Sequence, residues 1–284
     1  MMRLDAATVL LQWATGGLAF LWVTSRRREV GLGYGWLLRG TYGLLALAAV
    51  AVARVTEPSL GRDLFALLTA IAAGTALAVS IARRRAGVAA QRGHQERATA
   101  RVAAMTGIDR AAQRFDTDVP EFPPVLDLVA PALGAIGCLL AAVDTGGPVA
   151  LAALRFLVGA AFLGAITDAM LLGHWYLVQP GLGRAPLLEL VRWTALVWPF
   201  EVIAMLLPTG MFSVLNGSID DGWNGILGWM WLVCAVTTIG LCIVTRAALK
   251  ERQYSAVMAA TGLLYLAILT AFGTDLVARA VLAG

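Results

Sequence analysis

The chain alternates long apolar runs with short polar connections, and eight of these runs are long enough to be membrane-spanning helices. A bilayer core of about 30 Å takes about 20 helical residues, and a helix satisfies its own backbone hydrogen bonds there. No run shows the two-residue alternation of a membrane β-strand. We expect an all-α integral membrane protein with one polytopic domain over residues 1–284. The predicted spans are about 7–24, 36–53, 64–82, 124–143, 149–177, 187–207, 225–245 and 256–276.

Composition agrees with this pattern and excludes an ordinary water-soluble domain. Apolar residues make up 59% of the chain and charged residues only 14%, whereas soluble domains carry about 25% charged residues. The net charge of +4 does not indicate nucleic acid as a partner, because most basic residues flank apolar runs. Almost all of them are Arg, a bias typical of a GC-rich bacterial genome. We therefore expect the plasma (inner) membrane of a bacterium, with the lipid bilayer as the first partner.

Basic residues near span ends predict the orientation, since they concentrate on the inner side of a membrane. With the N-terminus outside, 17 of the 22 Lys and Arg residues fall inside. The remaining five, on the outer side, are Arg3, Arg54, Arg62, Arg155 and Arg279. Eight spans with both termini outside, periplasmic or extracellular, follow from this asymmetry.

Two connections are long. The inner loop at 83–123, between the third and fourth spans, begins Arg83-Arg84-Arg85. Its middle, about 87–114, is either an amphipathic helix on the anionic inner leaflet or a solvated linker. The outer loop at about 208–224 is rich in Gly and Asn, and it is either a docking or lid segment or a plain connection.

Ionisable residues inside a span are costly and usually face the bundle interior, which makes Asp168 and Arg192 candidates. They lie on the fifth and sixth spans, which a short loop joins as antiparallel neighbours. If Trp175 and Tyr176 mark the inner boundary, Asp168 is about 10 Å deep and Arg192 about 7 Å deep. We expect an Asp168–Arg192 ion pair that is either structural, or active in proton handling or headgroup binding.

His174 is the only histidine in a predicted span, and it stands beside Trp175 and Tyr176, with Trp193 on the next span. One membrane histidine cannot supply both ligands of a bis-histidine haem or a multi-histidine metal site. Three readings remain: contact with a quinone, since the near-neutral pKa of a histidine suits proton exchange; ligation of a single b-type haem; or a polar anchor at the interface.

Glu201 follows Pro199 well inside the sixth span. The proline removes a helical hydrogen bond near Ala195 and usually kinks the helix. A carboxyl group buried there is expected to be protonated or paired. Glu201 and Asp168 are thus either stations for protons or structural groups, while Asp127 and Asp275 are taken for ordinary interface residues.

Several chemistries lack support in the sequence. Cys138, Cys234 and Cys242 lie in apolar runs without a CxxC pair, so no disulfide framework or zinc site is indicated, and no metal site is predicted. Nucleotide-binding glycine motifs are absent. The first functional hypothesis is a membrane subunit of a bacterial respiratory or other electron-transfer complex, contacting quinone and bound to other membrane or redox subunits. The alternatives are a proton- or ion-coupled small-solute transporter or channel with a midplane site at Pro199, and a non-catalytic assembly subunit.

Overall fold

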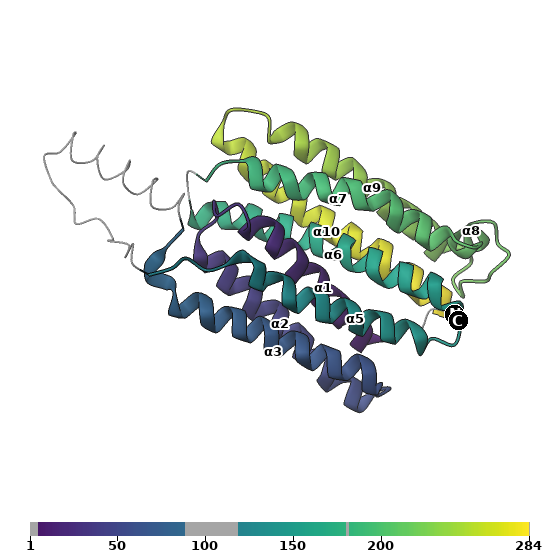
Figure 1. Ribbon diagram of the computed structural model, residues 1–284. Coiled ribbons are helices and arrows are strands. Elements are labelled where there is room, and N and C mark those ends of the chain that lie inside the picture. The colour runs from purple at the N-terminus through teal and green to yellow at the C-terminus, as the bar shows by residue number, and fades with distance from the viewer. Residues whose placement is uncertain (1–4, 89–118, 180–181, 284) are drawn as a thin grey trace, which may run out of the picture.

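The computed structural model describes residues 5–88, 119–179 and 182–283, and over these ranges the chain is helical with no strand. The helices form one elongated bundle (Figure 1). The long helices are α1 (Ala6–Ser25), α2 (Leu32–Val55), α3 (Leu60–Ala82), α5 (Val129–Val143), α6 (Val149–Val178), α7 (Ala185–Leu206), α9 (Ile226–Ala248) and α10 (Tyr254–Ala283). The short ones are η1 (Arg84–Ala86), η2 (Pro124–Leu128), which leads into α5, and α8 (Gly210–Leu215). The all-α prediction is confirmed.

Seven of the long helices in the described ranges are apolar enough to cross a membrane, so the chain is a multi-pass membrane protein. The exception is α7. It is 22 residues long and packs between α6 and α9, but it carries Glu189, Arg192 and Glu201.

The helix directions bring the first and last described helices, α1 and α10, back to one end of the bundle (Figure 1). The start of α1, the end of α10 and the short α8 lie at this termini end, while η1 and η2 lie at the opposite, loop end (Figure 1). The middle of the 83–123 connection, predicted to lie on the membrane surface, falls outside the described residues.

The centre of the bundle is built on α6, which packs against α1, α5, α7 and α10. At the crossing of α1 and α6 the two backbones touch. A Cβ atom on Gly16 would lie 1.7 Å from the carbonyl oxygen of Ala160, and one on Gly164 would lie 2.1 Å from the carbonyl carbon of Gly16. Small residues at such crossings are how membrane helices come close enough for van der Waals packing. Gly16 and Gly164 therefore allow the short distance between α1 and α6.

We expect Gly164→Ala to destabilise the folded protein by about 1–3 kcal/mol, the usual cost of overpacking, because its methyl group would push α1 off α6. The apparent melting temperature of the detergent-purified protein is the measurement. Gly74→Ala on α3 is the matched control, since a Cβ there meets nothing within 4 Å. Equal melting temperatures for the two variants would contradict the close crossing.

Candidate functional site

Polar side chains from four helices meet in a buried cluster at the termini end of the bundle. Gln12 comes from α1, Arg155 from α6, Glu201 from α7, and Asp275 and Arg279 from α10. Four of them have no exposed surface, and Arg155 is only 7% exposed. We call these five residues the four-helix cluster.

Arg279 is the hub of the four-helix cluster. Its Nε donates to Asp275 Oδ2 at 2.7 Å, one helical turn earlier on the same face of α10. Its Nη2 donates to Gln12 Oε1 at 2.5 Å, and its guanidinium carbon lies 5.3 Å from the ring centroid of Phe156. A buried charge is tolerated when it is paired and hydrogen-bonded. The hydrogen bond to the Gln12 side chain thus ties α10 to α1, and the ion pair holds the Arg279 guanidinium in place on α10.

A glycine on α6 makes room for these contacts. A Cβ on Gly159 would lie 2.2 Å from Gln12 Nε2 and 2.9 Å from Asp275 Oδ1. The amide and the carboxylate therefore both reach the α6 backbone, and a larger residue at this position would separate them.

Glu201 brings a second carboxyl group into the four-helix cluster. Neither of its oxygens receives a hydrogen bond from a nitrogen or hydroxyl donor, and its side chain lies within hydrogen-bonding reach of Asp275. An ionised carboxylate can only accept hydrogen bonds, so two carboxyl groups bond only when one of them holds a proton. A proton on one of the two carboxyl groups would therefore allow Glu201 and Asp275 to bond to each other.

Arg155 is held differently, by the end of α7. Its Nε donates to the carbonyl oxygen of Ala204 at 3.0 Å, and its Nη2 donates to that of Leu207 at 2.6 Å. These carbonyls are among those that the end of a helix leaves without intrahelical partners. Arg155 therefore fixes α7 against α6 on the side of the cluster nearest the termini end.

The four-helix cluster also contains polar atoms without hydrogen-bond partners, an unusual concentration for a protein interior. They are Gln12 Nε2, Arg279 Nη1, Asp275 Oδ1 and both oxygens of Glu201. Donors and acceptors thus stand side by side, and the cluster can bind or relay a proton.

Two surface pockets at the termini end approach the cluster. The larger, of about 490 Å³, reaches Phe156, whose ring Arg279 contacts. The smaller, of about 250 Å³, reaches Arg155 and is lined in part by Pro208, Gly210 and Ile219 of the 208–224 connection. The smaller pocket therefore reaches the cluster directly at Arg155, and the larger one is separated from Arg279 by the ring of Phe156.

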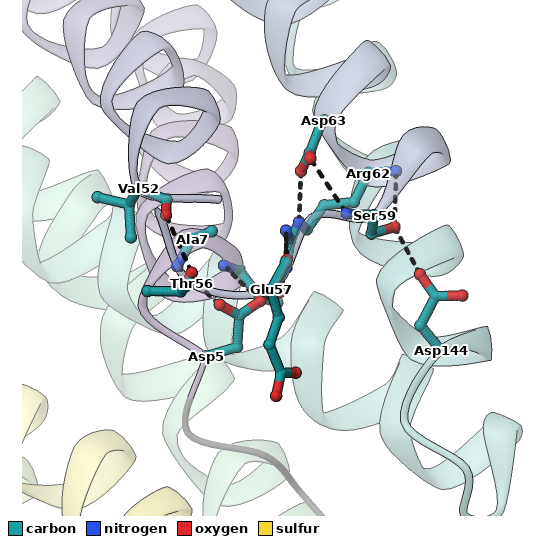
Figure 2. Close-up of polar contacts among 10 residues, drawn as sticks. Asp5, Ala7, Val52, Thr56, Glu57, Ser59, Arg62, Asp63 and Asp144 are labelled. Atoms are coloured by element: carbon teal, nitrogen blue, oxygen red, sulfur yellow. Dashed lines mark hydrogen bonds and ion pairs between the residues drawn. The ribbon is translucent and has the colours of Figure 1, made fainter. Parts of the chain in front are cut away.

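Figure 2 shows the polar mouth of the larger pocket. Arg62, 4% exposed, pairs with Asp5 and Asp63, and Ser59 Oγ donates to Asp144 Oδ2 at 2.5 Å. These contacts join the start of α1 to α3 and to the end of α5. The mouth carries more acidic than basic side chains.

Asp168 lies near the middle of α6 and is also fully buried. Its Oδ1 accepts the Tyr42 hydroxyl at 2.5 Å, and its backbone carbonyl accepts the Tyr34 hydroxyl at 3.2 Å. The predicted ion pair with Arg192 is not formed, because Asp168 faces α2 while Arg192 is exposed on α7. The helices are neighbours as predicted, but the two side chains point in different directions.

The four residues of the predicted quinone or haem site do not converge. His174 is exposed, with Nδ1 3.2 Å from the Tyr265 hydroxyl of α10. Trp175 packs against Tyr34, Tyr176 donates to the carbonyl of Gly183, and Trp193 meets the ring of Phe20. Successive residues of a helix point about 100° apart. The rings of His174, Trp175 and Tyr176, which are consecutive in the sequence, therefore point to different sides of α6. Among the described residues no group of three His, Cys, Asp or Glu could hold a metal ion.

Of the five residues of the four-helix cluster, only Glu201 was proposed as a functional candidate from the sequence. Asp275 is fully buried rather than an interface residue. Asp127 is likewise 3% exposed and accepts both Nε and Nη2 of Arg39, at 2.7 and 2.8 Å. The four-residue spacing of Asp275 and Arg279 was the available signal, since it puts opposite charges on one helix face.

Comparison of the chain with protein-family models, with curated proteins and with solved structures finds no match.

We expect Arg279→Met to cost about 3–5 kcal/mol of stability, because it leaves the Asp275 carboxylate buried without its cation. Unfolding of the detergent-purified protein by heat or by a denaturing detergent gives the comparison. Arg246→Met is the control, since Arg246 is exposed in the last turn of α9. If both variants unfolded alike, the Arg279 pair would not be a structural hub.

The Asp221 carboxylate lies outside the predicted spans, in the connection before α9, and it has a structural role there. Asp221 Oδ1 accepts the N–H groups of Trp223 and Gly225, and Oδ2 accepts those of Leu227 and Gly228. Burial alone would raise the pKa of the Asp221 carboxyl, but these four donors outweigh it and lower the pKa below its usual value. The ionised carboxylate thus holds the start of α9.

A depressed pKa means that the stabilisation is present above the pKa of the unfolded chain, about 4, and is lost as the pH falls through the folded value. Asp221→Ala should therefore melt at a lower temperature than the wild type at pH 7, and this gap should close as the pH falls below about 4. A gap that stayed constant across this range would rule out the ionised carboxylate as its source.

Proposed function

We propose that the chain is a proton-coupled transporter of small solutes, and that the Glu201–Asp275 pair carries the proton. One observation supports this above the others: two fully buried carboxyl groups lie within hydrogen-bonding reach of each other. Buried ionisable groups in membrane proteins mark ion and proton pathways. Arg279 balances the single negative charge of the pair when the pair holds one proton.

The topology that this function uses has eight spans, with the termini end of the bundle outside. An even number of crossings fits the position of both chain ends at one end (Figure 1). With α7 added to the seven apolar helices as a membrane crossing, Glu201 points into the cluster, while Glu189 pairs with Arg26 and Arg27 at the loop end. Arg83, Arg84 and Arg85 also lie at the loop end, which supports its placement inside, in the plasma membrane of a bacterium.

The four-helix cluster then belongs to the outer half of the membrane, and Asp168 to the inner half. Nine residues of α6, about 13 Å, separate Gly159 beside the cluster from Asp168. The side chains of Phe162, Leu163 and Ile166 between them are fully buried. Two polar sites with an apolar layer between them suit alternating access, in which only one side is open at a time.

A separate route leads toward Asp168 from the inner side. A small pocket of about 30 Å³ is lined by Ser25, Arg39 and Tyr34, and the Tyr34 hydroxyl donates to the Asp168 carbonyl. Protons that pass Tyr34 and Tyr42 would reach Asp168. In this proposal Asp168 is the inner station and Glu201 the outer one.

Electron transfer is the second candidate, supported by the exposed His174 and its hydrogen bond with Tyr265. A membrane quinone could reach this pair from the lipid, and a single haem would need a second ligand from a partner subunit. An absorption spectrum and an organic extract of the purified protein test both groups. Electron transfer would be favoured if the wild type contained bound quinone or haem and His174→Ala lost it.

We expect proteoliposomes containing the wild type to acidify or alkalinise in response to a transported solute, and Glu201→Gln to abolish this coupled proton movement. A pH-sensitive dye inside the vesicles, with a panel of small solutes outside, gives the measurement. Glu251→Gln is the matched control, because Glu251 is exposed at the loop end. Coupled flux that survives in Glu201→Gln would contradict the assignment of the proton to this pair.

A further inference from the structure

A pocket of about 360 Å³ lies at the loop end, between the residues that follow α1 and the first half of α7. Its lining joins charged and apolar side chains: Arg27, Ala185, Leu188, Glu189, Arg192, Trp193 and Leu196. The four-helix cluster contributes no residue to it, so this pocket is a separate site.

The charge at this pocket is positive. The Glu189 carboxylate pairs with Arg26 through one oxygen and with Arg27 through the other, both at 2.5 Å. Arg192 adds a third guanidinium, is exposed, and pairs with no side chain in the described part of the chain. Three arginines against one glutamate leave an excess of two positive charges. Guanidinium groups bind phosphate through paired hydrogen bonds.

An apolar stripe runs along α7 from the same arginine. Leu196, Phe200 and Ile203 are 55%, 56% and 52% exposed, and their spacing from Arg192 puts them on one face of the helix. From Leu196 to Ile203 the stripe covers about 10 Å. Trp193, beside Arg192, is 36% exposed and packs on Phe20 of α1, as an aromatic residue does at the membrane interface.

We propose that this pocket binds an anionic phospholipid of the inner leaflet, with its phosphodiester on Arg192 and Arg27 and an acyl chain along Leu196, Phe200 and Ile203. The apolar stripe selects the lipid over a soluble anion, which would use the arginines alone. Basic pockets between membrane helices on the inner side bind anionic headgroups in this way. The site depends on α7 crossing the membrane, which is part of the proposed topology, but it does not depend on transport.

The test is retention of lipid by the delipidated, purified protein. The protein is incubated with equal amounts of phosphatidylglycerol and phosphatidylcholine, and native mass spectrometry counts the bound molecules. We expect the wild type to retain phosphatidylglycerol in preference. Arg192→Gln should lower the ratio about fivefold, the effect of removing one basic contact with an anionic lipid. Arg246→Gln, at an exposed arginine of the same end, should leave the ratio unchanged.

Three results would overturn the lipid site: no preference for phosphatidylglycerol in the wild type, equal ratios in the two variants, or complete displacement of the lipid by millimolar inorganic phosphate. Phe200→Ser should weaken retention without changing the charge, and it separates the acyl contact from the headgroup contact. A protein that retains the lipid but moves no protons would refute the transport proposal and leave this site in place.

Discussion

A guanidinium group buried without water must find acceptors inside the protein, and this requirement for Arg279 organises the termini end of the bundle. Asp275 supplies the counter-charge from the same helix, and Gln12 supplies an amide oxygen from α1. Gly159 keeps α6 close enough for these groups to meet. Loss of Asp275 would leave the Arg279 charge without compensation inside the bundle, and loss of Gln12 would leave one of its donors without an acceptor.

The buried arginines and the buried acids of this protein differ in how completely they are hydrogen-bonded. Among the described residues, Arg39 bonds to Asp127, Arg62 to Asp5 and Asp63, and Arg155 to two backbone carbonyls. These three arginines therefore have acceptors.

Two other buried acids, Asp168 and Glu201, are hydrogen-bonded less completely than these arginines. Asp168 keeps one oxygen without a donor, and Glu201 keeps both. A carboxyl group that holds a proton can remain neutral inside a membrane, whereas an arginine stays charged. This difference makes the acids, rather than the arginines, the candidates for proton exchange.

The apolar runs of the sequence located the helices closely, because length and hydropathy decide which segments enter a membrane. The run at 149–177 became α6, Val149–Val178, and the run at 187–207 became α7, Ala185–Leu206. The rotation of α6 and α7 about their own axes could not be predicted from these runs, since both helices carry apolar residues on all faces. For that reason Asp168 and Arg192 were placed on the correct neighbouring helices but assigned to each other wrongly.

Asp275 and Arg279 were missed because the last span was predicted to end near residue 276. This boundary put Asp275 at the membrane edge and Arg279 outside it. In the structure α10 continues to Ala283, so Asp275 lies eight residues, about 12 Å, inside the helix. α10 can stay buried beyond residue 276 because Asp275 and Arg279, one turn apart, neutralise each other's charge.

Infrared spectra of the purified protein in H₂O and D₂O test whether Glu201 and Asp275 share a proton, as proposed. We expect the wild type to show the carbonyl band of a protonated carboxyl group that shifts on deuteration, and we expect this contribution to disappear in Glu201→Gln. Identical carbonyl regions in the wild type and the variant would contradict the claim.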